Sequence, residues 1–209
     1  AGPRGRCSGV VSGLEVSSLE FLGRMGACRR LGLAKCAAAA DWVVDRLENT
    51  ADKVVVFAYH LVVLNALHHI FLERLGAGVH RFFQGSTDEA TRQQYLKEFH
   101  AKQKTQEDKG CRVMLMSLQA GAVGVDLTCA CVALFVQLPT DVATLKQAEA
   151  RIHRKGQRRA CEAVFMLSDS GADGEAKAWE RLRAQATKIA GLVGGGQGDG
   201  VGGFSDQKG

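Results

Sequence analysis

The feature that most constrains the fold is a continuous apolar run at residues 53–59, which reads KVVVFAY. Because apolar and polar residues do not alternate in this run, it is typical of a β-strand buried on both faces. Such a strand needs a layer of structure on each side of its sheet. The composition allows this, since 46% of the 209 residues are hydrophobic and supply a sizeable core.

Strand-type and helix-type segments alternate along the chain. Further strands are expected at residues 79–83, 113–117, 132–136 and 163–167. Apolar residues at helical spacing predict helices at residues 35–49, 60–75, 86–101, 147–156 and 174–192. This alternation predicts an α/β domain over residues 35–193, a three-layer parallel sheet with helices on both faces. Residues 1–34 are expected to be a poorly defined N-terminal segment, and the glycine-rich residues 194–209 a disordered tail.

Ligands of parallel sheets bind at the carboxyl ends of the strands. Three segments are expected at this edge: residues 85–87, residues 117–128 and the segment leading into the helix around Gln147. Ser86 is followed three residues later by Glu89, which matches a capping box and predicts a helix start. Ser86 and Thr87 are therefore expected at a helix N-terminus, where N–H groups favour a phosphate.

Gln147, Arg151 and Arg154 are spaced i, i+4 and i+7 in the segment QAEARIHRKGQ. On a helix that ends at Gly156, all three side chains are expected on one face. Two guanidinium groups and an amide on one face form a receiver for an anion such as phosphate, which arginine binds with two hydrogen bonds. The alternative interpretation is a solvated basic face of a helix.

Charge and cysteine content add weaker constraints. The formal net charge of +5 and the isoelectric point near 8.9 mildly favour a polyanionic partner. The 7 cysteines include no C-x-x-C pair, which indicates reduced, mostly buried thiols. Cys129 and Cys131 are expected on one face of a strand, but no second pair at zinc spacing accompanies them, so a metal site is only a remote alternative. No apolar run reaches the roughly 18 residues of a membrane span, and residues 1–12 lack the apolar part of a signal peptide. We expect no membrane partner.

Four segments in order resemble the motifs of the second RecA-like lobe of superfamily 2 motors: VVVFAYH, GST with Arg92, LMSLQAGAVGVDLT and QAEARIHRKGQ. The last is similar to the form found in the Swi/Snf-related, SMARCA-like branch. The lead-in at residues 34–60 and the helix around Trp179 look most like the annealing-helicase subgroup. The resemblance covers residues 33–193 and implies a RecA-like fold.

The resemblance also implies roles for individual residues. Arg151 and Arg154 match arginine fingers, which reach the γ-phosphate of ATP held with Mg²⁺ by the first RecA-like lobe, and Gln147 orients their helix. Gly124 and Asp126 match a loop that senses both the nucleotide and DNA. Contacts with the DNA backbone are implied for Ser86, Thr87, Ser117 and Gly121. The family implies an ATP-dependent DNA translocase or annealing helicase, in replication-fork repair or chromatin remodelling in the nucleus.

Two departures from the family pattern bear on function. The segment at residues 137–141 reads QLPTD where the family usually has Trp-Asn-Pro, and no G-x-x-x-x-G-K-[ST] occurs in the chain. The chain alone is therefore predicted not to hydrolyse ATP. One alternative is a non-catalytic module that binds nucleic acid or a partner. Another is an unrelated small-molecule enzyme, which predicts a glycine-rich turn after the first strand, where the chain has Tyr59-His60-Leu61.

Overall fold

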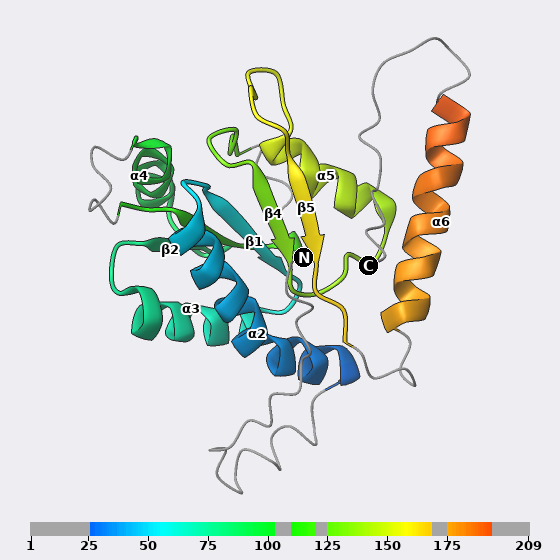
Figure 1. Ribbon diagram of the computed structural model, residues 1–209, viewed down its shortest axis with the longest axis horizontal. Helices are drawn as coiled ribbons and strands as arrows, with labels where there is room; N and C mark the ends of the chain where they lie inside the picture. The colour runs from blue at the N-terminus through cyan, green and yellow to red at the C-terminus, as the bar shows by residue number, and fades with distance from the viewer. Residues whose placement is uncertain (1–25, 103–109, 120–124, 169–174, 194–209) are drawn as a thin grey trace, which may run out of the picture.

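A computed structural model of the chain describes residues 26–102, 110–119, 125–168 and 175–193. It contains one parallel sheet of five strands in the order β2-β3-β1-β4-β5 (Figure 1). The strands are β1 Val54–Ala58, β2 His80–Phe83, β3 Val113–Ser117, β4 Val132–Phe135 and β5 Glu162–Phe165. The helices are α2 Ala27–Asn49, α3 Leu61–Leu75, α4 Glu89–His100, α5 Val142–Ile152 and α6 Glu175–Val193.

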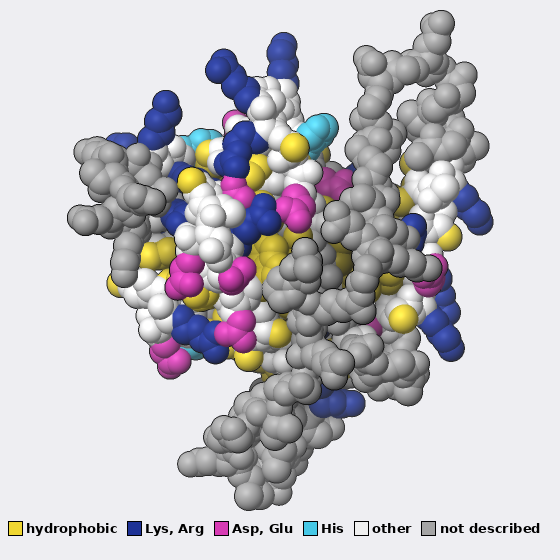
Figure 2. Space-filling model, in the orientation of Figure 1, with side chains coloured by type: hydrophobic (Ala, Val, Ile, Leu, Met, Phe, Trp, Pro, Cys, Tyr) yellow, Lys and Arg dark blue, Asp and Glu magenta, His cyan; other side chains and the backbone are white. Residues whose placement is uncertain are grey.

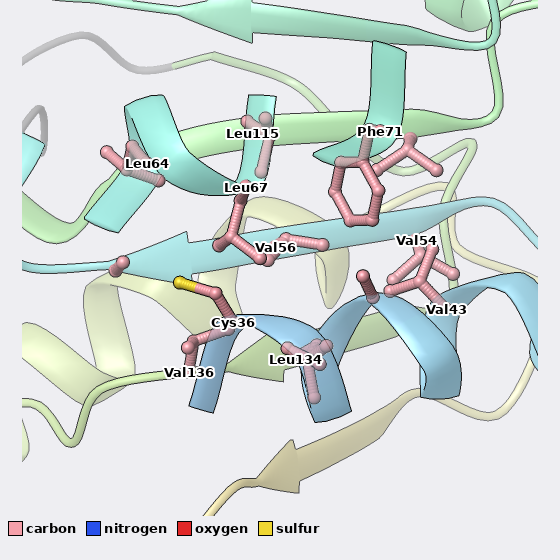
Figure 3. Packing of buried hydrophobic residues seen from close by; sticks show 14 of the residues in the cluster. Cys36, Val43, Val54, Val56, Leu64, Leu67, Phe71, Leu115, Leu134 and Val136 are labelled. Carbon is pink, nitrogen blue, oxygen red and sulfur yellow. The ribbon is translucent and has the colours of Figure 1, made fainter. Parts of the chain in front are cut away.

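The helices cover both faces of the sheet. On one face, α2 and α3 lie side by side, and Figure 3 shows their apolar side chains turned toward Val54 and Val56 of β1. On the other face, Phe99 of α4, Leu145 of α5 and Leu182 of α6 belong to a second buried cluster with the alternate strand residues. Strand β1 is buried along its whole length because it is the central strand between these layers. The predicted three-layer α/β arrangement is confirmed.

The predicted elements agree with the observed ones except at two helices. One is α5, which spans Val142–Ile152 where a helix at residues 147–156 was predicted, and the other is at the start of the chain. Strand β3 has the expected bounds, but α2 begins at Ala27, within the segment expected to be poorly defined. Its Gly32 lies against α3 and the residue Gln137 that follows β4, because a Cβ atom there would come within 2.7 Å of Gln137 and Val63. The absence of a side chain at Gly32 therefore allows α2 to pack closely at this point.

Helix α6 is fastened to the domain in two ways. A series of aromatic rings runs across the sheet, with centroids 4.8 Å apart between Phe135 and Phe165 and 4.6 Å apart between Phe165 and Trp179 of α6. On the other side of β5, Lys35 of α2 is only 2% exposed and its Nζ donates to a Glu175 carboxylate oxygen at 2.5 Å. The closing helix is thus part of the α/β domain.

The described cysteines are all free thiols. Cys36, Cys111 and Cys131 are buried, Cys129 and Cys161 are half-buried, and Cys28 is exposed. Burial raises the pKa of the Cys36 thiol to about 12, which keeps it protonated. The expectation that Cys129 and Cys131 share a strand face is wrong, because both precede β4.

Candidate functional site

The predicted site residues lie at two opposite ends of the sheet. Ser86 and Thr87 follow β2, and Ser117 is the last residue of β3, so these three lie at the carboxyl end. Because β4 and β5 are parallel neighbours, the connection through α5 must return the chain to the amino end. Arg151, Arg154 and Asp126 therefore lie at the amino end. The three segments expected at the carboxyl edge do begin there, after β2, β3 and β4, but these three residues do not lie at that edge.

At the carboxyl end, residues 84–87 form a turn that uses the Thr87 hydroxyl. The backbone N–H of Gln84 donates to Thr87 Oγ1 at 3.1 Å, and the N–H of Thr87 donates to the Gln84 carbonyl at 3.2 Å. Ser86 is exposed between them. Thr87 is thus engaged within the domain, while the Ser86 side chain faces solvent.

The predicted capping box is wrong. The N-cap of α4 is Asp88, whose carboxylate accepts from the N–H of Thr91 at 2.9 Å. This hydrogen bond lowers the pKa of Asp88, which keeps the cap ionised. An ionised carboxylate already occupies the helix N-terminus, so a phosphate contact here depends on the Ser86 hydroxyl.

Two further side chains at this end are engaged within the protein. Arg92 lies with its guanidinium carbon 5.3 Å from the centre of the Phe83 ring, and its Nη2 donates to the Gly85 carbonyl at 2.7 Å. Arg92 therefore holds the turn that presents Ser86. Ser117 is half-buried, and its Oγ accepts from the N–H of Gln119 at 3.2 Å.

The three residues of the predicted anion receiver do not share one helical face. Helix α5 starts at an Asp141 cap and ends at Ile152, so Arg154 lies beyond it. Gln147 is exposed, whereas Arg151 is only 7% exposed, and burial lowers the pKa of its guanidinium. Gly156, with a φ of 108°, belongs to the turn that follows and not to the helix end.

Gln157, the last residue of the motif, explains where the helix ends. Its Nε2 donates to the carbonyls of Ile152, Thr128 and Ala130 at 3.0, 3.0 and 2.8 Å. Its Oε1 accepts from the backbone N–H groups of Arg158 and Arg159. The sequence contained this residue within the motif without showing its role, which is to fix the turn after α5.

Asp126 lies next to the end of α5. Its carboxylate accepts from the N–H of Thr128 at 3.0 Å, and this bond, with smaller effects of His100 and Arg154, lowers its pKa. The N–H of Leu127 donates to the Arg151 carbonyl at 3.0 Å. Arg154 thus lies near enough for its charge to act on Asp126, whereas Gly121 and Gly124 lie outside the described residues.

The turn at residues 153–158, called here the basic turn, carries exposed cationic side chains. Figure 2 shows Lys and Arg side chains gathered above the loop between α5 and β5. The exposed residues with basic side chains in it are His153, Arg154, Lys155 and Arg158. An exposed, fixed group of positive charges at one end of the sheet can receive an anion from a neighbouring domain.

Arg159, which directly follows the basic turn, belongs to a different group of residues. This group, called here the Asp52 cluster, consists of Arg46, Asp52, Arg112 and Arg159. Asp52 is 4% exposed and pairs with Arg159 and with Arg46, whose Nη2 lies 2.8 Å from Oδ2. Burial alone raises the pKa of this carboxyl, but hydrogen bonds from Arg159, Arg46 and Cys131 lower it to about 2. Arg112 donates to the carbonyls of Leu47, Thr50 and Asp52.

Gln137, at the family's Trp-Asn-Pro position, joins three elements. Its Oε1 accepts from the N–H groups of Tyr59 and His60 at 3.1 and 3.0 Å. Its Nε2 lies 2.9 Å from both the Cys28 carbonyl and His60 Nδ1. A buried amide with all these partners fixes the end of β1 and the start of α3, so this departure from the family is structurally consistent.

No group of three or more His, Cys, Asp or Glu residues within the described ranges is arranged to hold a metal ion. None of the described helices is long and apolar enough to cross a membrane.

Comparison with known proteins identifies close similarities. Residues 35–156 match the family described as helicase conserved C-terminal domain. The chain is 29% identical over 159 residues to the mouse DNA annealing helicase and endonuclease ZRANB3. It is 31% identical over 146 residues to the Xenopus tropicalis SWI/SNF-related matrix-associated actin-dependent regulator of chromatin subfamily A-like protein 1. These matches cover 76% and 69% of this chain, but only 14% of each relative.

A solved structure supports the fold. The C-terminal part of the Fun30 ATPase domain superposes with a TM-score of 0.60 at 23% identity, covering 71% of this chain and 45% of that one. The predicted RecA-like fold is confirmed, as is the resemblance to the second lobe of Swi/Snf-related ATPases.

Proposed function

Because the chain belongs to the helicase conserved C-terminal domain family, we propose that it is the C-terminal motor lobe of an ATP-dependent DNA translocase or annealing helicase. In this role it acts with a first RecA-like lobe, which holds most of the ATP and Mg²⁺, and it contacts the DNA backbone. We propose replication-fork repair or chromatin remodelling in the nucleus as its setting, because one relative is named a DNA annealing helicase and another a regulator of chromatin.

The observation that carries this proposal is the position of Arg154. It is exposed in a turn fixed by Gln157, and its charge helps to lower the pKa of Asp126. A guanidinium group held in this way is preorganised to stabilise the charge that develops on a phosphate in a neighbouring lobe. Gly124 and Asp126 are proposed to sense the same nucleotide.

Arg151 and Gln147 are proposed to support the same reaction from α5. Arg151 is buried and its carbonyl accepts from Leu127, so its guanidinium meets a nucleotide only if the first lobe packs directly over the end of α5. Gln147 is exposed one turn earlier on α5. We therefore assign the larger contribution to Arg154.

The carboxyl end is proposed to contact DNA. Ser86 is exposed, Thr87 follows it in the turn after β2, and Ser117 ends the neighbouring strand β3; Gly121 belongs to the same motif as Ser117. Contacts of hydroxyl and backbone N–H groups with phosphate oxygens carry no information about the bases. We propose that binding at this end is independent of DNA sequence.

The test is ATP turnover by the full two-lobed protein with Arg154→Ala. An arginine finger contributes about 10³-fold or more to phosphoryl transfer, so we expect a loss of that order in kcat. Arg154→Lys keeps the charge but not the planar fork, and is expected to recover only part of the loss. Arg158→Ala, which removes another exposed arginine of the basic turn, is the matched control and should keep normal turnover.

Normal kcat in Arg154→Ala would remove this residue from the reaction. If the full protein binds DNA but never hydrolyses ATP, the alternative of a non-catalytic nucleic-acid or partner-binding module is favoured. The chain alone is expected to show no turnover, since it contains no P-loop sequence.

A further inference from the structure

Helix α4 connects the two ends of the sheet on which the proposed function depends. It begins directly after the turn that presents Ser86 and ends at His100. Since α4 links the parallel neighbours β2 and β3, it runs from their carboxyl end to their amino end. One helix therefore spans the distance between the proposed DNA contacts and the proposed nucleotide contacts.

Side chains hold α4 at its start and along its length. At its start, Arg92 donates to the Gly85 carbonyl and the Asp88 cap receives the Thr91 N–H. Further along, Glu98 forms an ion pair with Arg81 of β2, and the Arg81 guanidinium lies 5.7 Å from the Tyr95 ring centre. These contacts make α4 a rigid element that moves as one unit with its turn.

The end of α4 is anchored as firmly. Lys53 donates to the carbonyls of Phe99 and Ala101, the second at 2.6 Å, and Phe99 is fully buried. A lysine at a helix C-terminus satisfies carbonyl groups that lack a partner in the helix. His100 therefore has a fixed backbone position.

His100 joins this helix to the nucleotide end. Its Nε2 lies 2.8 Å from the carbonyl oxygen of Asp126, and because a carbonyl oxygen only accepts, Nε2 must donate. The next residue, Leu127, donates its N–H to the Arg151 carbonyl at the end of α5. Hydrogen bonds thus connect the end of α4 to the segment that bears Asp126, and that segment to the end of α5.

We propose that His100 is a positioning residue that links DNA contact at the Ser86 turn to the placement of Asp126 and of the arginines at and beyond the end of α5. The inference rests on the proposed function. DNA bound at the carboxyl end fixes the start of α4, and His100 passes this constraint to the Asp126 segment. His100 itself touches neither DNA nor nucleotide.

The test compares three substitutions of His100 in the full two-lobed protein. His100→Ala removes the donor and is expected to lower DNA-stimulated turnover about five- to ten-fold, the lower range of coupling between sites. Turnover without DNA and the Kd for DNA are expected to stay within about two-fold, because the residue acts only on the coupling. His100→Gln places a nitrogen donor at nearly the same reach and should restore stimulation, whereas the shorter His100→Asn should not. His69→Ala, which removes an exposed histidine of α3, is the control.

Several outcomes overturn the inference. If His100→Ala is stimulated by DNA as strongly as the unchanged protein, the link is wrong while the proposed function stands. If His100→Gln is as impaired as His100→Ala, the hydrogen bond is not the cause. Equal losses of turnover with and without DNA, together with a lower Tm, show a purely structural role. If the unchanged protein lacks DNA-stimulated hydrolysis, the proposed function and this inference both fail.

Discussion

The Asp52 cluster and the basic turn lie at the same end of the sheet, and both are rich in arginine, but they use it in opposite ways. In the cluster, Arg46 and Arg159 pair with one buried carboxylate, and Arg112 donates to three backbone carbonyls. In the basic turn, Arg154 and Arg158 are exposed. The exposed Arg154 and the paired Arg159 are thus only five residues apart in the chain.

This difference shows that the partner of an arginine, and not its spacing in the sequence, separates a structural role from a binding role. The cluster ties together the end of α2 and the starts of β1, β3 and β5, whose backbone carries these residues. A satisfied buried charge contributes to stability, whereas an exposed charge contributes little and remains available to a ligand. Substitutions in the cluster should therefore affect folding, and substitution of Arg154 in the basic turn should affect turnover.

The largest effect on stability is expected for Asp52→Asn. The native pKa near 2, against an ordinary 3.8, corresponds to about 2 kcal/mol of stabilisation by the paired arginines, which the amide loses. Urea unfolding at neutral pH should show this decrease in the free energy of unfolding. The matched control is Asp41→Asn, because Asp41 is exposed and pairs with the exposed Arg74, so its loss is expected to stay below about 0.5 kcal/mol. Equal effects in the two variants would contradict the comparison.

The pH dependence of stability should follow from the same pKa. Because the folded state lowers the pKa of Asp52, the stabilisation is fully present above the ordinary value of 3.8 and disappears as the pH falls toward 2. The difference in unfolding free energy between the unchanged protein and Asp52→Asn should be constant above about pH 5 and should shrink below about pH 4. A difference that stays constant down to acid pH would show that the carboxylate charge is not the stabilising group.

The sequence predicted the fold better than the site. Long patterns such as the apolar run of β1 report burial on both faces, so strand positions and layers were predictable. The Asp52 cluster was not, since its members are separated in sequence and meet only through the sheet. The end of α5 was placed wrongly because the Gln157 side chain, and not Gly156, takes the Ile152 carbonyl. Gln137 and His100 were missed for the same reason, since their partners are distant in the chain.

The smallest predicted effect concerns the turn at residues 84–87, at the carboxyl end of the sheet. There, too, an engaged group and an exposed group lie side by side. Thr87 Oγ1 accepts from the Gln84 N–H, whereas Ser86 is exposed, so one hydroxyl is engaged by the protein and the other is presented. In the two-lobed protein, Ser86→Ala should weaken DNA binding by about 1 kcal/mol, or roughly five-fold in Kd, and leave unfolding unchanged.

Thr87→Val should instead lower the free energy of unfolding by about 1 kcal/mol, because the Gln84 N–H loses its acceptor.

The effect of Ser86→Ala on DNA binding is measured by fluorescence anisotropy on two unrelated duplexes. The control is Thr187→Ala, which removes an exposed hydroxyl of α6. Affinity should fall equally for both duplexes and decrease with salt, since phosphate contacts release counterions. A loss on only one duplex indicates base readout and contradicts backbone binding. Unchanged affinity on both removes the turn from the DNA path, and the contrast between presented and engaged groups then holds only at the amino end.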